Sequence, residues 1–195
     1  MDAQSALPTR RLDAGATVTQ AEPWATAPVS LDSPATAVMT DLTRVKAATT
    51  AASTRLPQAE QLMIYQGVRM LFVVNQMPAV EGLVTSADLA GDRSMRIVQQ
   101  RGVRHDEITV GDVMHELSAL DAIDLDMLRA ARVSNVVATL KSLGRHHLLV
   151  IERAPGRPAR IVGVVSRTQV ERQLGKAIDI VEVAGSFADI NRMLS

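Results

Sequence analysis

An internal duplication is the feature that most constrains the fold of this chain. Residues 82–89 (GLVTSADL) are repeated as residues 163–170 (GVVSRTQV), and residues 37–42 (AVMTDL) recur as residues 112–117 (DVMHEL). Segments that recur in the same order along a chain indicate two copies of one structural unit. The copies differ at one acidic position, because Asp88 of the first is replaced by Gln169 in the second.

Each copy contains the same predicted series of strands and helices. Amphipathic helices are predicted at residues 56–67 and 133–144, where apolar residues recur at helical spacing and a glycine ends the pattern. A short extended segment precedes each helix (46–50, 119–125). Two strands follow it, at 70–74 and 80–85 and at 147–152 and 160–166, and a second helix closes each copy. This order predicts an α/β (α+β) fold of two β-α-β-β-α repeats. We expect each repeat to be a three-stranded sheet with two helices on one face, packed sheet to sheet against the other.

The remaining segments flank the two repeats. Residues 1–32 are rich in Ala, Thr and Pro and predict a flexible tail, in which Trp24 is either a stray residue or a docking anchor. We place the first repeat at 33–104, the second at 105–176 and a C-terminal extension at 177–195, with a last helix from about Ser186.

Composition excludes several classes of protein. The 21 basic residues balance the 21 acidic ones, so no overall charge favours nucleic acid, and the absence of cysteine excludes disulfides and thiolate metal sites. No apolar run reaches the length of a membrane span and no secretory signal is recognisable, so we expect a cytoplasmic protein without a membrane partner. The common catalytic and phosphate-loop motifs are absent, so we expect no enzyme.

Read together, the duplicated motifs resemble a known family. Two copies of a V-M-T-like segment, of G-V-R-x-L-x-V-V and of G-hydrophobic-hydrophobic-[ST]-x-x-D are similar to the CBS domain, across roughly residues 34–175. Paired copies form a Bateman module, and a chain without a catalytic domain resembles the stand-alone bacterial CBS proteins. The resemblance implies a homodimer and two pseudo-symmetric sites between the copies, which bind AMP, ADP, ATP or S-adenosylmethionine and regulate through a conformational change.

The resemblance assigns residues to each site. The first site centres on Asp88, which can accept hydrogen bonds from both hydroxyls of a ribose; its other candidates are Arg69, Thr85, Ser86, Ala122, Ile123, Arg145, His146 and His147. The second site takes Ala47, Ala48, Val68, Met70, Ser166 and Gln169. Because Gln169 is uncharged, we expect the Asp88 site to bind more tightly.

Alternative interpretations remain open at the sequence level. Thr85 and Asp88 also fit an ordinary helix N-terminus. His146 and His147 either line the cleft or pack in the core; they lack a third ligand for a metal, and His105 and His115 are expected to be solvated. The alternative function is a ligand-free structural or interaction module that binds an unknown protein partner.

Overall fold

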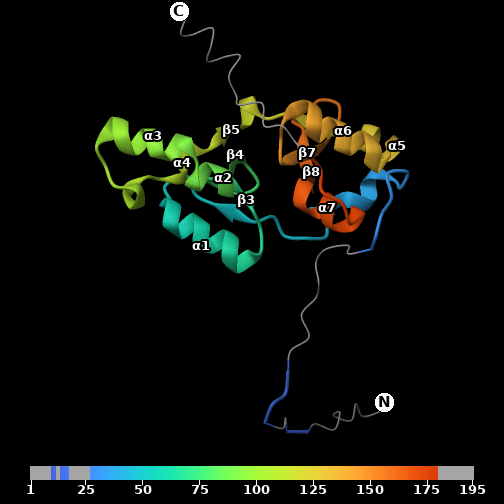
Figure 1. Cartoon of the computed structure of the whole chain (residues 1–195), viewed down its shortest axis with the longest axis horizontal. Helices are drawn as coiled ribbons and strands as arrows, with labels where there is room; N and C mark the ends of the chain where they lie inside the picture. The colour runs from blue at the N-terminus through green and yellow to red at the C-terminus, as the bar shows by residue number, and fades with distance from the viewer. Residues whose placement is uncertain (1–9, 12–13, 18–26, 180–195) are drawn as a thin grey trace, which may run out of the picture.

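The computed structural model describes residues 10–11, 14–17 and 27–179. Its folded part consists of two similar halves that lie side by side, with α1 and α3 in one half and α5 and α6 in the other (Figure 1). One half contains most of the first predicted repeat and the other contains most of the second.

The first repeat has the predicted order of elements. Its helix α1 ends at Gly67, whose φ of 64° is the left-handed conformation that favours glycine. The elements are η1 (Ala35–Val38), β1 (Met39–Asp41), β2 (Thr49–Thr50), α1 (Leu56–Gln66), β3 (Met70–Val74), β4 (Val80–Thr85), α2 (Ser86–Ala90) and α3 (Asp92–Arg101).

The second repeat follows the same plan. Its helix α6 ends at Gly144 with a φ of 59°, which confirms the predicted stop. The elements are η2 (His105–Glu107), α4 (Val110–Val113), β5 (His115–Glu116), η3 (Leu117–Ala119), β6 (Ala122–Asp124), α5 (Leu125–Ala130), α6 (Val133–Leu143), β7 (His147–Glu152), β8 (Arg160–Ser166) and α7 (Arg167–Leu174).

The two repeats exchange their first strands, which corrects the prediction of three-stranded sheets. The observed sheets each have four strands, in the orders β2-β3-β4-β5 and β1-β8-β7-β6. Strand β1 of the first repeat pairs with β8 of the second, and β5 of the second pairs with β4 of the first. Both exchanged strands, β1 and β5, cover a sheet edge that would otherwise leave backbone groups unpaired.

The exchange of strands explains, on steric grounds, why a glycine begins each repeated turn. A Cβ atom on Gly82 would overlap the backbone carbonyl of His115 in β5, and one on Gly163 would overlap the Met39 side chain of β1. Gly82 and Gly163 hold equivalent positions, so both are needed where an exchanged strand crosses closely.

Three apolar clusters hold the molecule together. Two of them lie between the helices and the outer face of one sheet each, and each includes residues of both repeats: Ala35 and Val38 join the second repeat, and Ile108, Val110 and Val113 join the first. The third joins the inner faces of the sheets through Met70, Phe72 and Leu83 of one sheet and Leu149 and Val164 of the other. The predicted packing of sheet to sheet is therefore confirmed.

The last part of the predicted tail belongs to the fold. The Val29 N–H donates to the Gln173 carbonyl at 2.9 Å, and Gln173 Nε2 donates to the Ala27 carbonyl at 3.2 Å. The Ser134 N–H donates to the Leu31 carbonyl at 2.9 Å. Residues 27–32 are thus tied to the second repeat, which corrects the predicted tail boundary at residue 32.

Trp24 and the helix predicted from Ser186 lie outside the described residues. Within the described ranges, no helix is both long and apolar enough to cross a bilayer.

Candidate functional site

A cavity of about 280 Å³ lies between the repeats on the side of Gln169. Its inner wall is apolar and includes the buried side chains of Met70, Phe72 and Val164. Three exposed cationic residues lie on its lining: Lys46, Arg69 and Arg172. Among the described residues that line this cavity, none is acidic. The cavity therefore combines an apolar interior with a cationic rim.

The residues predicted for the second site come together in this cavity. All six contribute to its lining, namely Ala47, Ala48, Val68, Met70, Ser166 and Gln169. Two residues predicted for the first site, Arg69 and His147, line it as well. Arg69 and His147 thus lie on the Gln169 cavity, while the charge of Asp88 still acts on His147.

A hydrogen bond from an exchanged strand reaches Gln169. The Thr40 Oγ1 hydroxyl of β1 donates to Gln169 Oε1 at 3.4 Å. At that length the bond is weak, so the amide remains able to bind another group.

The pseudo-equivalent contact at Asp88 is much stronger. His115 of β5 holds the position of Thr40, and its Nε2 lies 2.9 Å from Asp88 Oδ1. The Thr85 N–H and hydroxyl donate to Asp88 Oδ2 at 2.8 and 2.7 Å. Only 14% of the Asp88 side chain and 28% of the His115 side chain are exposed. Both carboxylate oxygens therefore already have protein partners, and the prediction that His115 is solvated was wrong.

The protonation of Asp88 follows from these contacts. Burial raises the pKa of its carboxyl group, but the hydrogen bonds from His115 and Thr85 outweigh burial and hold the pKa below its ordinary value. Asp88 is therefore an anion at neutral pH.

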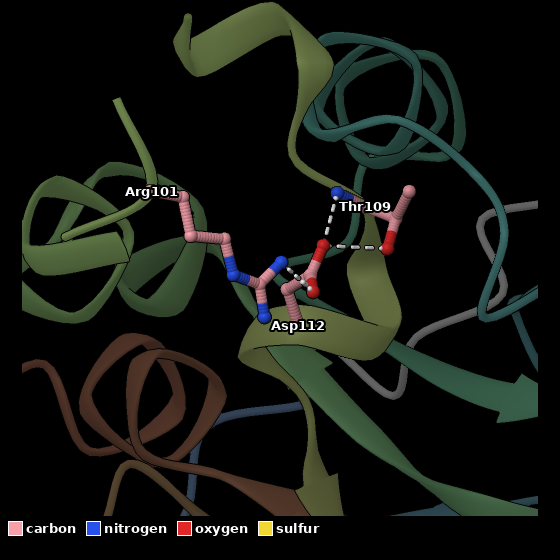
Figure 2. Close-up of polar contacts among 3 residues, drawn as sticks. All are labelled: Arg101, Thr109 and Asp112. Carbon is pink, nitrogen blue, oxygen red and sulfur yellow. Dashed lines mark hydrogen bonds and ion pairs between the residues drawn. The ribbon is translucent and has the colours of Figure 1, made fainter. Parts of the chain in front are cut away.

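A second threonine-aspartate pair shows that such a turn can serve a helix alone. Asp112 Oδ2 accepts bonds from the Thr109 N–H and hydroxyl at 2.9 and 2.8 Å at the start of α4 (Figure 2). Arg101 completes this arrangement as His115 does at Asp88, with its Nη1 directed at Asp112 Oδ1. The alternative interpretation of Thr85 and Asp88 as an N-terminal cap therefore has a close counterpart in the same chain.

The strand register corrects the predicted wall of the Asp88 cleft. Thr49 pairs with Phe72 in the first repeat, whereas Ala122 pairs with Leu149 in the second. Because Phe72 and Leu149 are equivalent, Ala122 and Ile123 match the residues at 49 and 50. The true counterparts of Ala47 and Ala48 are Leu120 and Asp121. The second repeat has a shorter connection before this strand, which shifts the match by two residues.

The surroundings of the two turns consequently differ in side-chain size and in charge. On the Asp88 side, Leu120 replaces the smaller Ala47, and Asp121 places a carboxylate where Ala48 has none. The three cationic residues of the cavity also have uncharged or weakly basic counterparts: Ala119 for Lys46, His146 for Arg69 and Gly91 for Arg172. The positive charge beside Gln169 therefore suits an anion better than the surroundings of Asp88 do.

The remaining predicted residues of the first site do not line the cavity. Ser86 begins α2, and its N–H donates to the Arg69 carbonyl at 2.9 Å. The equivalent bond joins the Arg167 N–H to the His146 carbonyl at 2.9 Å, which confirms the alignment of His146 with Arg69. Arg145 is exposed and its N–H closes the end of α6.

Sequence reasoning missed four residues near the clefts: Thr40, Lys46, His115 and Arg172. Thr40 and His115 end the repeated V-M-T and V-M-H triplets, so the duplication contained their signal. Lys46 and Arg172 have no basic counterpart in the other repeat, so no repeated motif marked them.

A broader cavity of about 670 Å³ shares Thr40 and Gln169 with the first. Its Arg44 lies 3.6 Å from Asp41, and its Arg160 lies 3.9 Å from Glu152. Since these arginines stand beside carboxylates, this second cavity has no clear preference for an anion. Across the described part of the chain, no three metal-ligating side chains gather in one group.

Comparisons with known proteins place the fold. Neither the family models nor the curated proteins contain a match to this chain. Among solved structures, the CBS-domain containing protein ATU1752 from Agrobacterium tumefaciens is 16% identical, with a TM-score of 0.50 over 68% of this chain and 88% of its own. The chain has the tandem CBS-domain fold that its sequence motifs predicted.

Two further solved structures are similar to this chain. An uncharacterized conserved protein from Pyrococcus horikoshii is 21% identical, with a TM-score of 0.54 over 78% of this chain and 100% of its own. The protein CBSX2 in complex with AMP is 18% identical, with a TM-score of 0.48 over 72% of this chain and 93% of its own.

Proposed function

We propose that this protein is a regulatory module that binds one adenosine nucleotide per chain in the Gln169 cavity. The observation that carries the proposal is the combination of an apolar interior with a rim of Lys46, Arg69 and Arg172 and no acidic residue in the described lining. An aromatic base suits the apolar part and phosphates suit the rim.

The charge of the rim also selects among adenosine ligands. AMP, ADP and ATP carry negative charge on their phosphates, whereas S-adenosylmethionine carries a sulfonium cation. Three cations without a carboxylate favour the phosphorylated ligands and disfavour the sulfonium. We therefore expect ATP or ADP to bind more tightly than S-adenosylmethionine.

This proposal reverses the expected ranking of the two clefts. Asp88 is already engaged by His115 and Thr85, so a ribose has to displace existing hydrogen bonds in order to reach it. Gln169 has one weak partner and needs no such displacement. The tighter site at Asp88, expected from the sequence, stays a prediction that the same experiment tests.

Regulation would follow from a change in the arrangement of the repeats. The cavity is lined by both repeats, so a nucleotide that contacts both can favour one relative arrangement over another. We expect this change to be transmitted in a homodimer. Exposed Ile64 and Tyr65 on α1 offer an apolar surface for its contact.

Calorimetry with ATP tests the proposal and separates the two clefts. We expect one ATP per chain, and we expect Arg172→Gln to weaken binding about 10- to 150-fold, since it removes a charge-assisted bond. Arg145→Gln serves as a matched control at an exposed arginine outside the cavity.

Each outcome is decisive for one hypothesis. If Asp88→Asn abolishes binding and Arg172→Gln has no effect, the Asp88 site is the tighter one and the proposal is wrong. If neither ATP, ADP, AMP nor S-adenosylmethionine binds the wild-type protein, the alternative of a ligand-free interaction module replaces it.

A further inference from the structure

One polar group in the cavity wall has no role in the proposed function described above. His147 is the first residue of β7, lies opposite Ser166 in the sheet and lines the cavity. Its Nδ1 is shielded from solvent and has no hydrogen-bond partner among the described residues. Polar atoms that are buried without a partner are rare in folded proteins, so each one requires an explanation.

The equivalent position in the first repeat makes the histidine more unusual. Met70 begins β3 and pairs with Thr85 as His147 pairs with Ser166. Met70 is buried and contributes to the same cavity and to the apolar cluster between the sheets. Packing alone is therefore satisfied by an apolar side chain at this place, and it does not account for an imidazole.

The surroundings of His147 keep the ring neutral. Burial lowers its pKa to about 4; His146 and Arg69 act in the same direction and Asp88 in the opposite one. A neutral imidazole has one donor nitrogen and one acceptor nitrogen. Such a ring matches the uncharged edge of a base better than a phosphate, which prefers cations.

The position of His147 within the cavity also favours a contact with the base and not with the phosphates. Met70, Phe72 and Val164, which share the lining with His147, are buried, whereas the cationic rim residues are exposed. A nucleotide whose phosphates meet the rim directs its base toward this apolar wall. His147, with Ser166 opposite it in the sheet, is then a polar group available to the base beside this wall.

We propose that His147 determines the base specificity of the cavity by hydrogen bonding to the edge of the nucleotide base. The proposal rests on the proposed function, since it requires a nucleotide in the Gln169 cavity. It requires the imidazole ring to turn when the ligand binds, because Nδ1 itself is shielded from solvent and has no partner among the described residues. The amino group at position 6 distinguishes adenine from hypoxanthine, so ATP and inosine triphosphate are the pair of ligands that reports on this contact.

The experiment compares the Kd values of ATP and inosine triphosphate in the full chain and its variants. We expect the wild-type protein to discriminate by about 2- to 12-fold, as one hydrogen bond between neutral groups allows. His147→Phe should bring the ratio close to one, and His147→Gln, which keeps a donor and an acceptor, should restore part of it. His105→Gln, a change outside the cavity, should retain the wild-type ratio.

The outcomes separate this inference from the proposed function. If ATP binds and the ratio is the same in wild type and His147→Phe, the base is read by another group and this inference fails alone. If neither ATP nor inorganic tripolyphosphate binds the wild-type chain, the proposed function fails and the inference fails with it. Should His147→Phe not fold, an unchanged ratio in His147→Met, which copies the apolar residue at the equivalent position of the first repeat, overturns it.

Discussion

The partly buried His147 predicts that the protein loses stability in mild acid and that a single substitution removes this loss. The unfolded chain takes up a proton on this histidine near its ordinary pKa of 6.5, whereas the folded chain resists protonation down to about 4. Between these values the unfolded state binds more protons, so stability falls as the pH is lowered. At neutral pH the ring is unprotonated in both states, so none of this stability is lost.

The magnitude follows from the same two pKa values. Linkage gives a loss of about 2 kcal/mol in the free energy of unfolding between pH 7 and pH 5 from this one group. His147→Met copies the residue at the equivalent position of the first repeat, Met70, and it removes both the titration and the unpartnered Nδ1. We expect the variant to be at least as stable as the wild type at pH 7 and to lose about 2 kcal/mol less on going to pH 5.

Urea denaturation at the two pH values measures this difference. The difference between the variant and the wild type in this loss of stability cancels the contributions of the carboxylates and of the other histidines, which both proteins share. His105→Gln is the control for the removal of a histidine outside the cavity, and its loss of stability between the two pH values is compared with that of His147→Met. Equal losses in His147→Met and wild type would refute the argument that His147 is held neutral by burial.

Three further predictions follow from the packing. Gly82→Ala should lower the free energy of unfolding by about 1–3 kcal/mol in urea titration, and by more than Gly163→Ala, because a backbone carbonyl obstructs the first and a flexible methionine the second; equal losses would count against this reading. Asp88→Asn should cost about 1.5–3 kcal/mol through its bonds with His115 and Thr85, and a loss below about 0.5 kcal/mol would show that the pair contributes little. Sedimentation should give a dimer for the wild type and a monomer for Tyr65→Glu, whose residue is 90% exposed on α1; a monomeric wild type at tens of micromolar would exclude this contact.

Much of the fold was determined by local sequence. The helices α1 and α6 and the strands β3, β4, β7 and β8 occur where apolar spacing and terminal glycines predicted them. These signals are readable because hydrophobic periodicity and left-handed glycines act within one element and its nearest neighbours. The duplication then led to the packing of the two sheets, since neither repeat can cover its own sheet.

The exchange of strands and the surroundings of the two repeated turns were decided by the tertiary structure. β1 and β5 are short, and their partners lie in the other repeat, so no periodicity within them could reveal the pairing. That pairing brings His115 to Asp88 and Thr40 to Gln169, and the strand register brings Leu120 and Asp121 to the places of Ala47 and Ala48. A motif records which residues are present, but the charge and space around them depend on long-range contacts. For that reason the sequence located both turns correctly, while the three-dimensional arrangement determined which of them has an open, cationic cavity.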